Sequence, residues 1–263
     1  ERIDAHKIRE RSESFGDHFS QARLFFRSMS KHEQEHIIAA YSFELGKVER
    51  EFIRARQVNE ILANIDLELA KRVAQNLGLP APKKGTVPER KTSPERSPAL
   101  SQANLLSGDI KTRKVAILAA NGVDGAAIDA LKKALEAAGA HAKLLGPTSA
   151  PVTMADGKSL PVDASMEGLP SVAFDAVFVP GGAKSVQALS GDGVALHYLL
   201  EAYKHLKAIA LAGEAKQLLD VLKLEADAGL IVGGDAKALK AFFAAIAQHR
   251  VWDREPKAKA VPA

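Results

Sequence analysis

From Lys114 onward, short apolar runs alternate with stretches whose apolar residues recur every three or four positions. The first run, 115–119, reads Val-Ala-Ile-Leu-Ala, and the helical stripe that follows it ends at Gly139. Such a continuous apolar run is typical of a strand buried on both faces, and parallel strands need crossover helices between them. The alternation therefore predicts an α/β domain, a flavodoxin-like doubly wound parallel sheet with helices on both faces.

The rest of this region continues the pattern. The dipeptide Asp156-Gly157 favours a two-residue hairpin turn within 152–162. The spacing also predicts strands at 141–145, 175–179, 208–212 and 230–232, and helices at 193–205, from Glu214 and at 235–248. We expect residues 114–250 to form one domain. A tail, 251–263, follows it, and we expect Trp252 to anchor this tail to a surface.

Residues 1–78 have the apolar spacing of helices. Ser30 and Glu33 have the spacing of a capping box, so a helix should start at Lys31. Asp66 is a second candidate cap, and the run Leu77-Gly78-Leu79-Pro80 should stop the last helix. These helices are short for an independent core, and we expect an α-helical segment attached to something larger.

A proline-rich linker, 79–113, separates these two parts. Its prolines lie among Lys, Arg, Glu and Ser, at Pro80, Pro82, Pro88, Pro94 and Pro98. Such a segment buries too little apolar surface to offset its chain entropy, so it can be ordered only by lying along another surface.

Composition excludes several classes of protein. The chain has 263 residues and no cysteine, so a disulfide-stapled module, a Cys-ligated metal centre and a cysteine nucleophile are excluded. The formal charge is only +4, without a basic stripe of interleaved aromatic residues, so we expect no nucleic-acid partner. No apolar run approaches the ~20 residues of a membrane span. We expect a cytoplasmic protein and, since the start Glu1-Arg2-Ile3-Asp4 has neither a methionine nor a signal-peptide pattern, a chain that begins inside a longer polypeptide.

One local motif suggests a metal. His32-Glu33-Gln34-Glu35-His36 matches H-E-x-x-H, which on a helix places two imidazoles on one face as zinc ligands beside a general base. The helix is expected to begin at this motif, however, so capping is the simpler role for Glu33. Glu60 is available as a third ligand but has no clear context, and we assign no metal site.

The rim at the carboxyl ends of the strands is where a doubly wound sheet binds its ligands. It comprises 121–124 (Asn-Gly-Val-Asp), 181–183 (Gly-Gly-Ala) and 213–215 (Gly-Glu-Ala). The first is not G-x-G-x-x-G, and a nucleophile at the third would need a Cys or Ser where the chain has Gly213. The residues alone therefore indicate no catalytic, cofactor-binding or metal-binding site.

Two long stretches resemble a known family. The runs 9–25 (RERSESFGDHFSQARLF) and 35–45 (EHIIAAYSFEL) closely resemble the C-terminal helical region of monofunctional haem catalases of the large-subunit class. Further runs, at 172–180, 201–207, 210–213 and 249–252, look like the extra C-terminal domain that only those catalases carry. Together the similar runs span nearly the whole chain in the same order.

The resemblance implies a parent that converts hydrogen peroxide to water and oxygen at a haem. Its distal His and Asn and its proximal Tyr belong to a β-barrel core that would precede Glu1, so none maps onto this chain. The implied partners are this core and the other subunits of a homotetramer. Positions like Gln21, Phe25 and Met29 help to line an NADPH site in small-subunit relatives, but large-subunit members generally do not use it, and we do not assign it.

The outer domain also resembles the class I glutamine-amidotransferase-like superfamily, which includes PfpI-type proteases. Where those enzymes have their nucleophilic Cys and neighbouring His, this chain has Gly213 and Glu214. Where they often have an acid after the first strand, it has Ala127. The resemblance therefore implies a vestigial pocket and argues against hydrolase activity.

Three hypotheses follow. The first is the C-terminal part of a large-subunit catalase, non-catalytic by itself, which supports tetramer assembly and stability. The second is a chaperone-like or ligand-binding flavodoxin-like module. The third is a stand-alone hydrolase or zinc peptidase.

Overall fold

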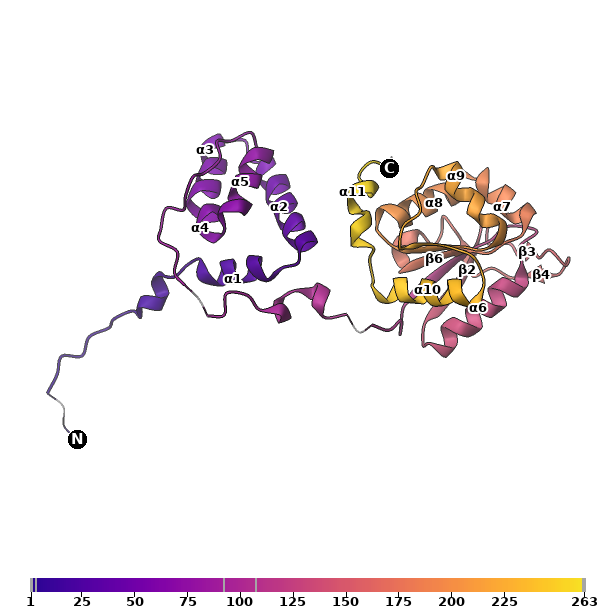
Figure 1. Cartoon of the computed structure of the whole chain (residues 1–263), viewed down its shortest axis with the longest axis horizontal. Coiled ribbons are helices and arrows are strands. Elements are labelled where there is room, and N and C mark those ends of the chain that lie inside the picture. The colour runs from indigo at the N-terminus through magenta and orange to yellow at the C-terminus, as the bar shows by residue number, and fades with distance from the viewer. Residues whose placement is uncertain (1, 3, 92, 107, 262–263) are drawn as a thin grey trace. The chain divides into compact units, whose positions relative to one another are not determined.

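The structure is a computed structural model that describes residues 2, 4–91, 93–106 and 108–261. The chain divides into two units, Glu1–Leu105 and Leu106–Ala263 (Figure 1). In the part that the structure describes, no helix combines the length and apolar character needed to cross a membrane.

The first unit is built from short helices around a small apolar core (Figure 1). Its helices are α1 (Ser20–Ser28), α2 (Lys31–Gly46), α3 (Glu51–Arg56), α4 (Ala63–Ile65) and α5 (Leu67–Asn76), and the π-helical η2 (Gln57–Leu62) joins α3 to α4. One-turn 3-10 helices are η1 (Glu13–Gly16), η3 (Pro98–Leu100) and η4 (Gln102–Asn104). The core brings together Phe26, Ile38, Val58, Leu62, Leu69 and Val73.

Local capping determines where these helices begin and end, as the sequence predicts. Helix α2 begins at Lys31, and the Ser30 N–H donates to Glu33 Oε2 at 2.8 Å in a capping box. The Asp66 carboxylate accepts from the backbone N–H groups of Glu68 and Leu69 at the start of α5. Helix α5 ends at Asn76, and Gly78 then adopts φ +68°. The three predicted boundaries are confirmed.

The proline-rich segment lies along the helical unit. The Oδ1 atom of the buried Asn64 accepts from the Thr86 and Val87 N–H groups at 2.8 and 3.0 Å. Further along, Arg27 Nη1 lies 2.8 Å from Glu89 Oε1, and the Ser97 N–H donates to Ser28 Oγ at 2.9 Å. The order of this segment therefore comes from polar contacts with the helices. We call residues 85–91 and 93–102 the strap.

The second unit contains a six-stranded parallel sheet in the order β5-β2-β1-β6-β7-β8. Its strands are β1 (Lys114–Leu118), β2 (His141–Gly146), β5 (Ala164–Ser165), β6 (Ala176–Val179), β7 (Ala208–Leu211) and β8 (Leu230–Val232). Apart from the added edge strand β5, this is the flavodoxin strand order. The predicted α/β, doubly wound fold class is confirmed.

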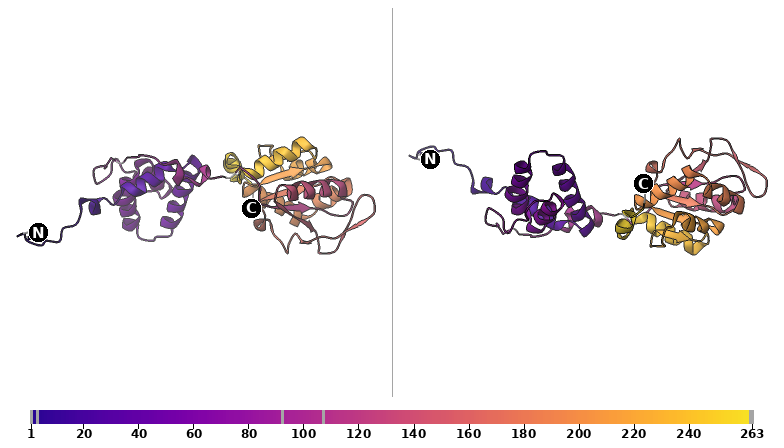
Figure 2. Two further views of the ribbon diagram at one scale, coloured as in Figure 1. Left: turned by 90° about the horizontal axis from the view of Figure 1, so that it is seen from below. Right: turned by 90° about the horizontal axis from the view of Figure 1, so that it is seen from above.

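Helices cover both faces of the sheet (Figures 1 and 2). Helices α6 (Gly125–Ala137) and α10 (Ala236–Ala247) pack on one face, where Ile117, Leu131 and Phe242 are buried. Helices α7 (Ala183–Ser190), α8 (Gly193–Lys204) and α9 (Leu218–Leu222) pack on the other. The unit also contains the short helices η5 (Ser171–Ala173), η6 (Gly213–Gln217), η7 (Trp252–Arg254) and α11 (Glu255–Ala258). Trp252 packs against the apolar cluster on the face covered by α7, α8 and α9, as expected of a residue that anchors the tail.

The hairpin differs from its prediction in the turn. Strands β3 (Val152–Thr153) and β4 (Ser159–Leu160) pair antiparallel, and the Met154 N–H then donates to Lys158 O at 2.8 Å. Three residues lie between this pair rather than two, and Gly157 has φ +86°. The loop therefore has three residues and ends in a left-handed glycine, which is a common type of hairpin connection. The prediction of a two-residue turn is wrong.

Candidate functional site

Three loops meet at the carboxyl ends of β1, β6 and β7, the rim where doubly wound sheets bind ligands. The Asp124 N–H donates to Gly181 O at 2.9 Å, and the Ala120 N–H donates to the buried Ser185 Oγ at 2.9 Å. The structure therefore brings the first two predicted loops into direct contact. Ser185 is a positioning residue that no sequence motif indicated.

The β3–β4 hairpin covers the first of these loops. The Gly122 N–H donates to Thr153 O at 2.6 Å, and Val123 pairs with Met154. A Cβ atom added to Gly125 would lie 2.2 Å from the Met154 sulfur. The hairpin thus packs directly on the start of α6 and covers the loop that follows β1.

Gly213 forms the turn after β7 with φ +53°, a left-handed conformation that glycine adopts without strain. A Cβ atom there would lie 3.3 Å from Gly181 Cα, so a side chain would fit only tightly. The backbone makes a sharp strand-to-helix turn, but it presents no side chain that could act as a nucleophile.

Glu214 occupies the nearest backbone donor. Its Oε2 accepts from the Gly182 N–H at 2.9 Å, and this hydrogen bond lowers the pKa of Glu214. A backbone amide at such a turn could stabilise a developing oxyanion, but here it binds a carboxylate of the same chain. The lowered pKa also makes Glu214 a weak base.

Two further rim positions are explained by backbone geometry. Gly182 has φ +110°, and a Cβ atom there would lie 2.3 Å from Gly122 O, so only glycine fits between the loops. Ala127 lies in the first turn of α6, where its N–H donates to Asp124 Oδ1 at 3.3 Å. Its side chain is a methyl group, so this position supplies no acid.

The H-E-x-x-H residues lie at the start of α2. The Glu33 carboxylate accepts from the Ser30 N–H, from Ser101 Oγ at 2.7 Å and from the Gln102 N–H at 3.0 Å. Burial raises the pKa of Glu33, but the hydrogen bonds from Ser30 and Ser101 outweigh it and lower that pKa to about 2. Glu33 therefore caps the helix, as predicted, and also holds the strap. Among the described residues, no cluster of three His, Cys, Asp or Glu could hold a metal ion.

The positions compared with an NADPH site all lie on α1 or at its end. Phe25 is 48% exposed, Met29 is buried, and Gln21 is exposed. Their steps of four residues place them along one side of α1, where Gln21 and Phe25 are exposed to solvent.

The comparisons with known proteins agree with this geometry. A family described as "Catalase-related immune-responsive" matches residues 12–77, and the "C-terminal domain found in long catalases" matches residues 111–256. Catalase HPII of Pseudomonas putida is 64% identical over 264 residues, which cover 100% of this chain and 37% of that protein. Catalase HPII of Pseudomonas aeruginosa is 54% identical over 266 residues, with the same coverage.

A more distant relative gives the same result. Catalase-B of Dictyostelium discoideum is 45% identical over 265 residues, which cover 100% of this chain and 38% of that protein. The chain thus spans little more than a third of the length of the relatives that it matches. The helical unit, the doubly wound unit and the sequence identities together show that this chain belongs to the long-catalase family and is homologous to its C-terminal region.

Proposed function

We propose that this chain acts as the C-terminal part of a long catalase, whose parent protein converts hydrogen peroxide to water and oxygen. The observation that carries the proposal is the match over 100% of this chain to relatives of which it covers only 37%. In this proposal the chain itself is non-catalytic. It supports the assembly and stability of a cytoplasmic homotetramer, and its partners are the catalase core and the other subunits.

The proposed parts follow the sequence boundaries. Residues 1–78 act as the helical domain, 79–113 as the linker, 114–250 as the flavodoxin-like domain and 251–263 as the tail. The strap supports a structural role for the linker, because its contacts with Asn64 and Glu33 place it on the helical domain.

The helical unit has apolar surface that a partner could cover. Large side chains remain exposed on several of its elements, including Phe15 (66%), Phe43 (65%) and Phe52 (63%). We propose that another part of the assembled protein covers these side chains, because contiguous apolar patches mark surfaces that proteins bury on association. This exposure supports a role in assembly with the remainder of a catalase.

The chain's own tyrosines do not fit a haem site. A haem iron held by tyrosine needs the phenolic oxygen to point into the cofactor pocket. The Tyr198 hydroxyl instead donates to Leu169 O at 3.2 Å, and the Tyr203 ring lies 4.5 Å below the Arg254 guanidinium. Tyr41 lies half-buried on α2. The proposal therefore places haem in the parent core and no cofactor in this chain.

The direct test is the intact mass and absorption spectrum of the native protein, with an assay of oxygen release from peroxide. We expect a subunit much larger than 28.0 kDa that has a Soret band and releases oxygen. A native species of 28.0 kDa without haem and without oxygen release would overturn the proposal.

A second test addresses assembly in the full-length protein. We expect Phe43→Glu together with Phe52→Glu to convert the tetramer to smaller species in size-exclusion chromatography. The control is Val172→Glu, because Val172 is 80% exposed on η5 in the other unit. An unchanged tetramer in the double variant would argue against these aromatic residues as assembly contacts.

A further inference from the structure

A groove of about 740 Å³ lies within the α/β unit, away from the rim. It is bordered by Lys114 and His141, the first residues of β1 and β2, and by Phe174, just before β6. These positions are at the amino ends of the strands. The groove is therefore distinct from the rim loops around Gly213, which follow the carboxyl ends.

The sheet leaves part of a strand edge open in this groove. The His141 N–H donates to Arg113 O, and Leu145 O accepts from the Ala119 N–H, so the odd-numbered residues of β2 face β1. Alternate residues of a strand direct their backbone groups to opposite sides. Ala142, Leu144 and Gly146 therefore face the other neighbour.

The outer side of β2 is paired at only two of these three residues. Leu144 exchanges hydrogen bonds with Asp163, and Gly146 O accepts from the Met166 N–H at 2.9 Å. The paired strand β5 is only two residues long and reaches no further than Leu145. Ala142 lies beyond it and lines the groove, so its N–H and C=O are open to a ligand.

Positive charge surrounds this open edge. Lys114, Lys132 and Lys143 line the groove together with Glu136 and Asp163. Asp163 already binds Lys143 at 3.2 Å. Lys132 also acts on Asp163 and helps to lower the pKa of that carboxyl group. Among the described residues Lys114 forms no ion pair, and the three ammonium groups of the groove outnumber its two carboxylates by one.

The remaining lining is apolar. Leu169 and Phe174 belong to the apolar cluster on the α7–α9 face of the sheet, and Ala140 and Ala142 belong to the cluster on the α6–α10 face, so the groove spans the end of the sheet. Phe174 and Ala140 are both buried, so the groove has an apolar lining on each face of the sheet. Ligand sites commonly combine such an apolar lining with a few polar groups that fix orientation.

We propose that this groove binds a small carboxylate with an apolar body. The carboxylate accepts hydrogen bonds from the Ala142 N–H and from Lys132 or Lys114, and the apolar body lies over Phe174 and Leu169. A peptide strand is disfavoured, because Asp163 already occupies the next outward-facing residue, Leu144. The site goes beyond the assembly role, since it needs neither haem nor other subunits.

The test is an NMR titration of the isotopically labelled full chain with 4-phenylbutyrate, and with its uncharged amide as the control ligand. We expect saturable shifts of the Ala142, Lys143 and Ala173 amides with the carboxylate and much weaker binding of the amide. Lys132→Gln should raise the Kd about threefold, the effect of losing one exposed ion pair.

Lys133→Gln is the matched control variant. It removes the same charge from the adjacent position of α6 but does not line the groove. We expect it to leave the Kd unchanged. The proposal is overturned if the Ala142 region does not respond, if the uncharged amide binds equally well, or if both lysine variants weaken binding equally. None of these readouts depends on peroxide turnover, so the site and the proposed function can fail independently.

Discussion

The helical unit and the α/β unit are stabilised in different ways. In the α/β unit, large apolar clusters cover both faces of the sheet. The helical unit has one smaller cluster, and the strap is attached to it by polar groups such as Asn64 and Glu33. Single polar substitutions should therefore matter most in the helical unit, with one exception in the α/β unit.

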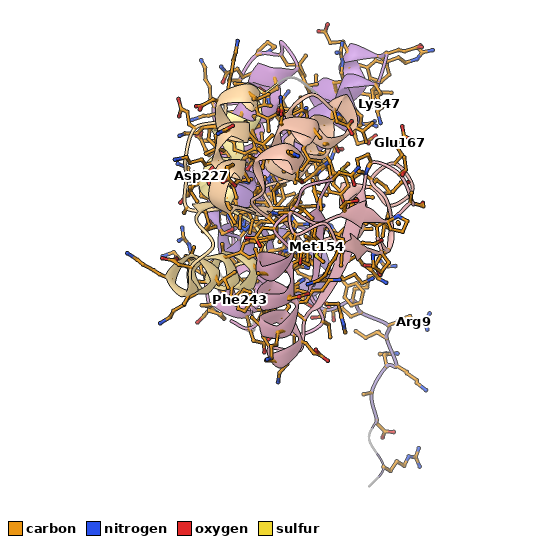
Figure 3. All side chains as sticks on the ribbon, turned by 90° about the vertical axis from the view of Figure 1, so that its right-hand side faces the viewer. Arg9, Lys47, Met154, Glu167, Asp227 and Phe243 are labelled. Carbon is orange, nitrogen blue, oxygen red and sulfur yellow. The ribbon has the colours of Figure 1, made fainter. Side chains whose placement is uncertain are left out.

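That exception is Arg254, whose side chain is fully buried. Its guanidinium binds both Asp227 oxygens at 2.6 and 2.8 Å and donates to Lys207 O at 2.7 Å. Burial raises the pKa of Asp227, but Arg254 outweighs it, so that pKa is lowered overall. Figure 3 labels Asp227 within the α/β unit. This contact attaches the C-terminal tail to the domain.

The largest expected effect is therefore that of Arg254→Met. It leaves the Asp227 carboxylate buried without its cation and should destabilise the α/β unit by about 3–5 kcal/mol. Urea unfolding followed by the fluorescence of Trp252, the only tryptophan, measures this loss. Lys257→Met is the control, because it removes an exposed pair with Glu225, and it should leave the midpoint unchanged. Equal urea midpoints for the unsubstituted protein, Arg254→Met and Lys257→Met would show that the stability of the unit depends on its apolar clusters alone.

Asn64→Ala should have the next largest effect, in the helical unit. It removes the acceptor for the Thr86 and Val87 N–H groups and the 2.7 Å contact with Thr86 Oγ1. We expect a loss of about 1–3 kcal/mol and faster tryptic cleavage at Lys83 and Arg90. Asn59→Ala is the matched control, since exposed Asn59 bonds only to Ala55 O in its own helix. If both variants are cleaved at the same rate, Asn64 does not hold the strap.

A smaller effect should depend on pH through Glu33. Its folded-state pKa is about 2, below the ordinary value of 4.5 for a glutamate, so its contribution to stability is present above pH 4.5 and lost as pH falls toward 2. After allowance for solvent screening, we expect Glu33→Gln to cost about 1 kcal/mol at neutral pH and progressively less in acid. Hydrogen exchange of the backbone amides of residues 102–104, followed as a function of pH, measures this loss of stability. Glu44→Gln, at an exposed pair with Lys47, is the control. If the stability cost of Glu33→Gln stays constant across this pH range, the ionised Glu33 carboxylate does not hold the strap.

The same contrast explains how far the sequence predicts the structure. Apolar runs and helical stripes predict the parallel sheet, since burial on both faces leaves a periodic signal. The two-residue β5 and the helix α7 were not predicted, because elements this short carry little periodicity. The strap contacts join residues as far apart as Glu33 and Ser101, so no local pattern indicates them. The groove follows from where β5 ends, and only the three-dimensional structure shows that.

The smallest expected effect is that of Glu214→Gln at the rim. Glu214 is exposed, and its contact with the Gly182 N–H is a single hydrogen bond that a glutamine oxygen can still accept. We expect the Trp252 unfolding midpoint to stay unchanged, while the Gly182 amide resonance shifts because its acceptor loses its charge. A fall in the midpoint as large as the Asn64→Ala effect would mean that polar rim contacts stabilise the α/β unit as strongly as the strap contacts stabilise the helical unit. Polar contacts would then stabilise both units equally, contrary to the contrast between them. An unchanged midpoint with a shifted amide would mean that Glu214 occupies the rim amide without supporting the fold.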